Sequence, residues 1–373
     1  MRLFKRIALL LLVTIIIALL VLLRSTEWLR SLGGRLDEQR LARVKRSPNF
    51  AGTKFRNEEP SRLLNDTSNV ELLRRQFFGN EQRTPLAPVP VERRSAGDYT
   101  KRPAAGLRAT WIGWSTVLLE IDGALVVTDP IWSDRCSPST LVGPKRFHPA
   151  PIALHELPHV DAVVISHDHY DHLDMPTVEL LASRGTHFFV PLGIGAHLER
   201  WQIPAAQIHE LDWNESASLR GIRFTATPAR HYSGRNPRYG NETLWSSWVI
   251  AGATHRVFFS GDTGYTAAFR RIGAAHGPFD LALIKIGASD VSWQTIHMSP
   301  EEAVQTAADV RARLMLPVHW ATFNLAYHSW SDPADRAVAA AQRSGVAIAL
   351  PKIGQFVVPS NPPPLARWWT AER

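Results

Sequence analysis

The stretch Val163 to Asp174, which reads VVISHDHYDHLD, decides the fold. It begins within an apolar run, Ala162 to Ile165, that has the character of a buried strand and ends in a turn. The turn presents three imidazoles and one carboxylate within six residues: His167, His169, Asp171 and His172. Borderline divalent metals such as zinc prefer imidazole nitrogens and carboxylates. Because four such side chains on one short loop crowd a single ion, we expect two metals side by side.

The bulk composition is that of a globular protein. The 373 residues suffice for one large or two ordinary domains with ample core. Hydrophobic residues make up 45% and charged residues 20%, which excludes a disordered chain. The single cysteine, Cys136, excludes an internal disulfide and a thiolate metal cluster.

The positive charge lies at the N-terminal end. Residues 1–23 carry a net +3, residues 24–108 carry +8 (18 basic and 10 acidic), and residues 109–373 carry −3 (21 basic and 24 acidic). A nucleic-acid-binding face would put the basic excess on the domain itself, so we expect no nucleic-acid partner. Basic residues beside an apolar segment instead favour an anionic membrane surface, which the basic linker would contact.

The apolar segment is Ile7–Leu23, a run of 17 uncharged residues flanked by Arg6 and Arg24. This length is at the short end for a transmembrane helix. Arg24–Trp28 offers no small-residue cleavage site, which argues against a signal peptide. We expect an uncleaved, single-pass anchor in a bacterial inner membrane. Positive charges on both sides of the run leave its orientation open.

Four regions follow from this pattern: a membrane anchor at 1–24, a basic linker or collar at 25–104, a catalytic domain at 105–358 and a C-terminal tail at 359–373. Within the domain, Asp122-Gly123 predicts a hairpin between strands at Thr116–Ile121 and Ala124–Thr128. Helices are expected after Ser299, which begins a capping box, and after Ser331. Further strands are expected at Ala162–Ser166, His187–Val190, Gln207–Leu211, Ile222–Thr227, Ser247–Ile250, Arg256–Ser260 and Asp280–Ile286.

Further candidate ligands follow the ends of other apolar segments. His231 comes after Ile222–Thr227, and Asp262 lies in the turn after Arg256–Ser260. The remaining candidates are His297, in the loop after Asp280–Ile286, and His319, after the run Leu314–Val318. Asp129 places another carboxylate at a strand end. Their shared placement at strand ends indicates one site.

The pattern His167-x-His169-x-Asp171-His172 after a strand resembles the hallmark of the metallo-β-lactamase superfamily. Longer stretches are similar to the N-acyl-phosphatidylethanolamine-hydrolysing phospholipase D branch and extend over about residues 105–325. They are Ala105–Trp111, Thr128–Ile131, Gly143–Phe147, Ser166–Asp174, Phe189–Gly193, Glu210–Trp213, Gly261–Tyr265, Gly277–Leu281 and His319-Trp320.

The resemblance implies an α/β fold, a four-layer αββα metallo-β-lactamase sandwich, with two Zn²⁺ per chain at one edge. By motif position, the first zinc would be held by His167, His169 and His231. The second would be held by Asp171, His172 and His319, with Asp262 bridging both. Two such metals share a water, lower its pKa and present hydroxide to a phosphodiester phosphorus.

The resemblance also implies roles for other residues. Asp129 would lie outside the ring of metal ligands and would orient one of them. The catalytic residues would be Asp262, Asp171 and His297, the last as a substrate contact or proton donor. One departure is Trp114, which stands where family members commonly have His. An indole cannot replace an imidazole as ligand or acid, so this departure bears on substrate preference.

The function that these features favour is a membrane-anchored, zinc-dependent phospholipase D. It would cleave the phosphodiester of N-acyl-phosphatidylethanolamine or a related membrane phospholipid, giving phosphatidic acid and an N-acylethanolamine. One alternative is hydrolysis of a lactone or of a cyclic or small phosphodiester on the same metals. Another is an iron-dependent redox enzyme on the same fold. Whether the chain forms a homodimer is left open.

Overall fold

The predicted hairpin at Asp122-Gly123 forms in the computed structural model, which describes residues 6, 10–15, 26–65, 67–101, 103, 106–236 and 238–370. It joins two central strands of a mixed sheet. Within the described residues this sheet has seven strands in the order β15-β3-β4-β5-β6-β7-β8. Their bounds are Phe356–Val357 (β15), Leu107–Gly113 (β3), Thr116–Ile121 (β4), Ala124–Thr128 (β5), Ala162–Val164 (β6), His187–Pro191 (β7) and Ile208–Leu211 (β8).

A second mixed sheet packs against the first. Within the same part of the chain it has six strands in the order β14-β13-β12-β11-β10-β9. Their bounds are Met315–Val318 (β14), Leu281–Lys285 (β13), Arg256–Phe259 (β12), Ser247–Ala251 (β11), Ile222–Thr227 (β10) and Ser216–Leu219 (β9). The strands predicted from the sequence are thus found within one or two residues of their expected bounds.

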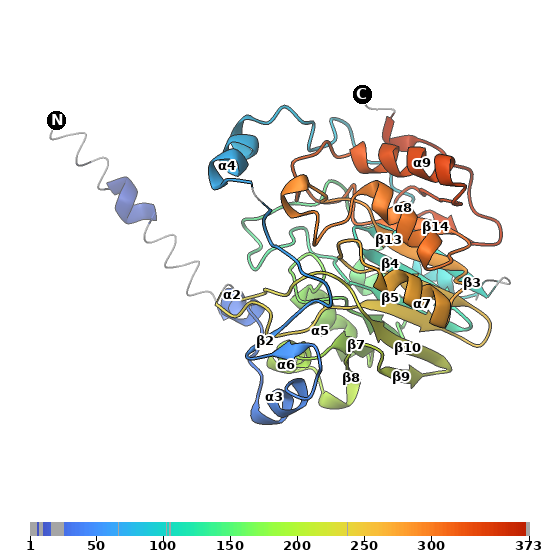
Figure 1. Ribbon diagram of the computed structural model, residues 1–373, viewed down its shortest axis with the longest axis horizontal. Coiled ribbons are helices and arrows are strands. Elements are labelled where there is room, and N and C mark those ends of the chain that lie inside the picture. The colour runs from blue at the N-terminus through green and yellow to red at the C-terminus, as the bar shows by residue number, and fades with distance from the viewer. Residues whose placement is uncertain are drawn as a thin grey trace.

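Helices cover the outer faces of the two sheets (Figure 1). Those beside the first sheet are α5 (Met175–Ser183) and α6 (Gly195–Arg200). Those beside the second are α7 (Ala268–His276), α8 (Pro300–Asp309) and α9 (Asp332–Ser344). The last two are the predicted helices, and α8 begins with the expected Ser299 capping box. This arrangement of layers is the expected αββα sandwich.

Alternation along β5 shows how the layers are held together. Ala124 and Val126 belong to the apolar core that also contains the second sheet. Leu125 and Val127 point the other way, into a core shared with α5. Successive side chains of a strand face opposite sides of the sheet, so a strand buried on both faces is apolar throughout.

Strand direction gathers the candidate ligands at one edge. β5 and β6 are parallel, as are β12, β13 and β14. β10 and β12 both run antiparallel to β11 and therefore point the same way. The loops that follow these strands start from the carboxyl ends, where sites of α/β sheets form.

The segment expected to be a linker and collar follows the surface of the sandwich. Val44 and Phe55 are buried in a small apolar cluster with Trp245 of the domain. The guanidinium of Arg40 contacts Glu210 at 2.6 Å. The elements of this segment are α2 (Thr26–Ser31), α3 (Glu38–Val44), β1 (Phe50–Ala51), β2 (Lys54–Phe55), α4 (Asn69–Phe78) and the short helix η1 (Ala96–Tyr99).

The structure describes less of the N-terminal end of the chain than of the C-terminal end. The anchor expected at Ile7–Leu23 lies outside the described residues except for residues 10–15. In the part of the chain that the structure describes, no helix is both long enough and apolar enough to cross a bilayer. The C-terminal tail packs onto the domain: Trp369 is 1% exposed, and Trp368 stacks on Trp320 with ring centroids 5.3 Å apart.

Four further short helices lie in connecting segments. They are η2 (Leu154–Glu156), η3 (Ala205–Gln207), η4 (Val291–Trp293) and η5 (Trp368–Thr370).

Candidate metal centre

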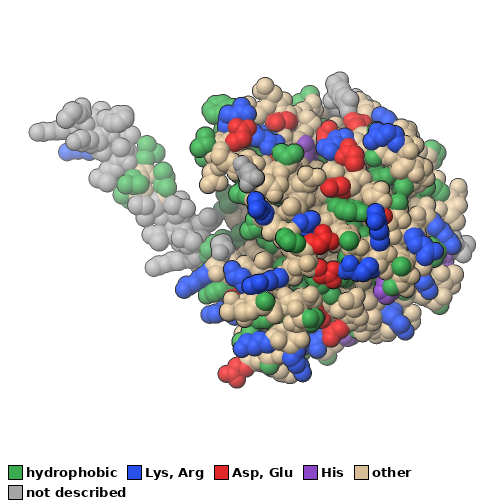
Figure 2. Space-filling view, viewed as in Figure 1, with side chains coloured by type: hydrophobic (Ala, Val, Ile, Leu, Met, Phe, Trp, Pro, Cys, Tyr) green, Lys and Arg blue, Asp and Glu red, His purple; other side chains and the backbone are tan. Residues whose placement is uncertain are grey.

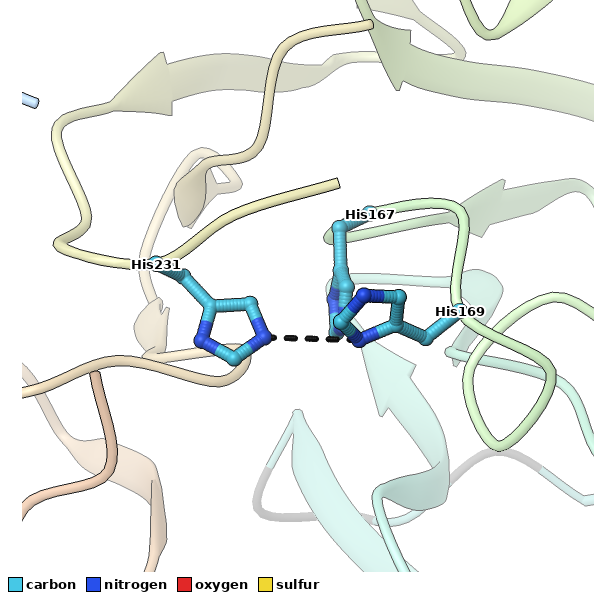
Figure 3. A group of neighbouring side chains, drawn as sticks. All are labelled: His167, His169 and His231. Atoms are coloured by element: carbon cyan, nitrogen blue, oxygen red, sulfur yellow. Dashed lines mark hydrogen bonds between the residues drawn. The ribbon is translucent and has the colours of Figure 1, made fainter. Parts of the chain in front are cut away.

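Three of the predicted imidazoles converge in the structure (Figure 3). His167 and His169 come from the loop after β6, and His231 comes from the loop after β10. His169 Nδ1 lies 2.8 Å from His167 Nε2 and 3.4 Å from His231 Nε2. The three ligand nitrogens are all within 4.8 Å of one another, which suits a single ion.

A second group lies beside the first and has four members: Asp171, His172, Asp262 and His319. His319 Nε2 is 2.9 Å from Asp262 Oδ2, and 3.2 Å from His172 Nε2. Asp171 Oδ2 is 3.2 Å from His172 Nε2. These atoms also lie within 4.8 Å of one another, so they too can share one ion.

Asp262 connects the two groups. Besides its place in the second group, it clusters with His231 of the first group and with His297. Asp262 is therefore the carboxylate that lies close to both groups, and the bridging role that the resemblance implies for it stays a prediction.

Residues behind the ligands fix their orientation. Asp129 is fully buried and has its Oδ2 2.5 Å from His172 Nδ1. The backbone N–H and the hydroxyl of Ser166 donate to the same carboxylate. The carbonyl of Ile296 lies 2.9 Å from His231 Nδ1. In both histidines Nδ1 is occupied and Nε2 is left to face the cluster, which is how metal-ligating imidazoles are held.

Burial and neighbouring charges shift the pKa values of Asp262 and His167. Burial opposes ionisation of Asp262, but His319 and His172 outweigh burial and lower its pKa well below the ordinary range. Burial lowers the pKa of His167 well below its ordinary value, and the neighbouring imidazoles add to this. An ionised carboxylate and a neutral imidazole are the forms that bind metals.

One buried atom fits the presence of a cation. Among the residues that the structure describes, Asp262 Oδ1 has no hydrogen-bond partner. A carboxylate oxygen buried without a partner is unfavourable unless a cation or a donor occupies the space before it. The mixed nitrogen and oxygen donors suit zinc, and they also suit iron.

His297 lies at the side of this cluster. Its Nδ1 is 3.8 Å from Asp262 Oδ2 and 3.1 Å from the Nζ of Lys285. Lys285 is fully buried at the end of β13, and burial lowers the pKa of its ammonium to about 8. In the sequence, Lys285 is visible only as a lone lysine that ends an otherwise apolar strand. Its place beside the site was therefore not predicted.

Residues of the cluster line part of a cavity of about 400 Å³, among them His169, Asp171 and His319. The polar part of its lining includes Asp262, His297 and Tyr232. Apolar side chains form the remainder of its lining: Leu63, Leu64, Ala288, Trp293, Ile296 and Leu325.

The N-terminal segment also reaches this centre, which the sequence did not reveal. Asn57 accepts a hydrogen bond from the backbone N–H of His231 and donates one to its carbonyl. Residues so far apart in sequence give no local pattern from which the contact could be predicted.

Comparisons with known proteins agree with this geometry. Residues 125–320, just over half of the chain, match the family model of the beta-lactamase superfamily domain. An uncharacterized protein of Mycobacterium tuberculosis is 48% identical over 329 residues, which is 87% of each chain. N-acyl-phosphatidylethanolamine-hydrolyzing phospholipase D 1 of Caenorhabditis elegans is 40% identical over 247 residues, covering 63% of this chain and 69% of that protein.

Among solved structures, Igni18, a metallo hydrolase from the archaeon Ignicoccus hospitalis, superimposes with a TM-score of 0.52. The superposition covers 67% of this chain and 97% of the Igni18 chain, at 23% sequence identity. This similarity shows the fold alone. The family match, the relatives and the His/Asp cluster lead to one conclusion. The chain belongs to the metallo-β-lactamase superfamily as a metal-dependent hydrolase, and within it resembles the N-acyl-phosphatidylethanolamine-hydrolysing phospholipase D branch.

Proposed function

We propose that this protein is a zinc-dependent phospholipase D that hydrolyses the phosphodiester of N-acyl-phosphatidylethanolamine or a closely related phospholipid. The products are phosphatidic acid and an N-acylethanolamine. The protein holds two zinc ions per chain and is attached to the membrane by the N-terminal apolar run at Ile7–Leu23.

The observation that carries the proposal is the composition of the cavity over the His/Asp cluster. Asp171, Asp262 and His319 form its polar end, while Leu63, Leu64 and Trp293 belong to its apolar lining. A phospholipid needs this combination, because its phosphodiester is charged and its acyl chains are apolar. The 40% identity to a phospholipase D of this substrate class supports the same choice.

The ligands divide into two sets. His167, His169 and His231 would hold one zinc, and Asp171, His172 and His319 the other, with Asp262 between them. When bound, the two ions supply Lewis acidity that neutralises phosphoryl oxygens and lowers the pKa of a water.

The chain's own residues handle the leaving group. Lys285 donates its ammonium hydrogen to Nδ1 of His297, so the ring proton of the neutral imidazole resides on Nε2. His297 lines the cavity and in this form acts as a hydrogen-bond donor to the departing alkoxide oxygen. As the Nε2 proton passes to the alkoxide, Nδ1 takes a proton from the ammonium of Lys285, so His297 stays neutral and the N-acylethanolamine leaves as an alcohol.

A direct test uses the zinc-loaded full-length chain and N-acyl-phosphatidylethanolamine in mixed micelles, with mass-spectrometric detection of phosphatidic acid. We expect wild type to release phosphatidic acid and Asp262→Asn to lose at least about 10³-fold in rate, because the charge that bridges the metals is gone. The matched control is Asp332→Asn, whose side chain is 40% exposed on α9.

The proposal fails if zinc-loaded wild type releases no phosphatidic acid under these conditions. Parallel assays with a lactone and a cyclic phosphodiester identify the other hydrolase. Metal analysis of protein purified without added metal separates zinc from iron.

A further inference from the structure

Helix α4 turns four of its five apolar side chains outward, and Leu72 is half-buried. Val70, Leu73 and Phe77 follow the spacing of one helix face and are 75%, 59% and 74% exposed, and the adjoining Phe78 is 76% exposed. The half-buried side, which faces the protein, includes the charged Arg75. A surface helix of a soluble protein has the opposite arrangement, with its apolar stripe toward the core. The orientation of α4 therefore needs an apolar partner outside the domain.

Specific contacts hold α4 in this orientation. The guanidinium of Arg75 makes a bidentate pair with Asp290, at 3.0 and 2.6 Å. Just before the helix, the hydroxyl of Thr67 lies 3.1 Å from that of Ser292. A bidentate arginine–carboxylate pair fixes direction as well as distance. The apolar face is thus presented outward by polar bonds.

The same contacts join α4 to the rim of the cavity over the metal centre. Val291, next to Asp290, is 73% exposed, and its carbonyl accepts a hydrogen bond from Asn65 at 2.6 Å. Leu63 and Leu64, just before Asn65, line the cavity itself. Exposed apolar residues are therefore found from α4 through Val291 to Leu63 and Leu64 in the lining of the cavity.

A second apolar surface lies at α2, the first described helix after the apolar run Ile7–Leu23. Leu29 of α2 is 49% exposed. The loop that shares a cavity with α2 exposes Leu141 and Val142, by 72% and 54%. Figure 1 shows α2 and α4 on the same side of the domain, and Figure 2 shows hydrophobic side chains along that margin.

We propose that the outward face of α4, consisting of Val70, Leu73, Phe77 and Phe78, inserts into the surface of a lipid bilayer and places the cavity entrance against the headgroups. The 17-residue apolar run identifies the bilayer as the partner, since it ends only three residues before α2 begins. A helix that lies in the interface buries its apolar face to the depth of the headgroups. Phenylalanine, leucine and valine are suited to that depth.

This inference extends the proposed function by naming the surface on which it operates. The test measures insertion of α4 into the bilayer and does not depend on substrate turnover. Failure of this proposal can therefore be distinguished from failure of the proposed phospholipase activity. The full-length chain is reconstituted in vesicles of phosphatidylcholine and phosphatidylglycerol. Phe77→Cys carries an environment-sensitive dye on the new thiol. The matched control is Ser218→Cys, an exposed residue on β9, which Figure 1 shows at the other end of the domain.

We expect the emission of the dye at position 77 to shift to shorter wavelength with vesicles and to be quenched by spin-labelled lipid, while position 218 shows neither effect. Background labelling of the native Cys136 is expected to be low, because this residue is only 7% exposed. A dye at position 77 that remains in water while the chain is in the vesicle overturns the proposal. A dye that is shielded without lipid, and released on dilution, also overturns it, because a second copy of the chain then covers α4.

Discussion

The indole Nε1 of Trp114 lies 3.1 Å from Oδ2 of Asp171 and donates a hydrogen bond to it. The Trp114 ring also packs on His319, with ring centroids 3.9 Å apart. Trp114 stands where the family resemblance leads one to expect a histidine. It cannot bind a metal, but it positions two residues that we assign to the second zinc. The departure from the family pattern thus has a structural role beside the ligands.

Replacing Trp114 with phenylalanine keeps the packing and removes the N–H donor. We expect Trp114→Phe to weaken zinc binding at the second group by about 10- to 100-fold, as loss of a partner behind a ligand does. Competition with a zinc chelator measures this. Trp330→Phe, at another buried tryptophan, is the control. Unchanged zinc affinity in Trp114→Phe would show that the hydrogen bond does not support the site.

Asp122 ties the two sheets together and predicts a pH dependence of stability. It accepts hydrogen bonds from the ring of His255 at 2.6 Å and from the backbone of Thr254 at 2.7 Å. Burial opposes its ionisation, but these donors outweigh burial and lower its pKa below 3.8. A depressed carboxyl pKa stabilises the fold above the unfolded value, and this stability is lost as the pH falls through the folded value.

We therefore expect Asp122→Asn to lower the free energy of unfolding by about 1–2 kcal/mol at pH 7. Asparagine tolerates the positive φ of 45° at this position, so the turn is retained. The difference from wild type narrows below a pH of about 3.8. Urea unfolding in the presence of a chelator measures the free energy of unfolding of both proteins at each pH. A difference that stays constant from pH 7 to pH 3 would contradict the assignment.

The thiol of Cys136 should be unreactive in the folded protein. Burial raises its pKa, and the nearby carboxylate of Asp171 raises it further. Because the thiolate is the reactive form, a thiol reagent at pH 8 should modify no site in the native chain. After unfolding in urea it should modify one thiol per chain, since the sequence contains one cysteine. Rapid modification of native protein would show that this region opens.

The C-terminal tail should contribute to stability. Trp369 is 1% exposed and donates its indole N–H to Asp335 at 3.1 Å. We expect Trp369→Ala to destabilise the fold by about 3–5 kcal/mol, the usual effect of emptying a buried tryptophan site. The control Leu365→Ala, at a residue 40% exposed, should change stability by less than about 0.5 kcal/mol. Equal effects of the two substitutions would mean that the tail is not part of the core.

The strands and the residues of the metal centre were predictable because their signals are local. Apolar runs such as Ala124–Thr128 end at turns, and the candidate ligands follow such ends. Parallel strands bring their carboxyl ends to one edge, so placement at strand ends is enough to assemble the cluster.

Other features depend on contacts between distant parts of the chain. Asn57 and His231 are 174 residues apart, and Arg75 and Asp290 are 215 apart. Single polar residues of this kind do not change the local pattern, so neither pair was predicted. The outward direction of the apolar face of α4 has no local sequence signal either, because it depends on the pairing of Arg75 with Asp290.

The central claim is that water attacks the phosphorus of a phospholipid at the centre around Asp262. Hydrolysis of N-acyl-phosphatidylethanolamine in ¹⁸O-labelled water, followed by mass spectrometry of both products, tests this most directly. We predict one ¹⁸O atom in the phosphate of phosphatidic acid and none in the N-acylethanolamine. Label in a released fatty acid, or in the N-acylethanolamine, would contradict the account.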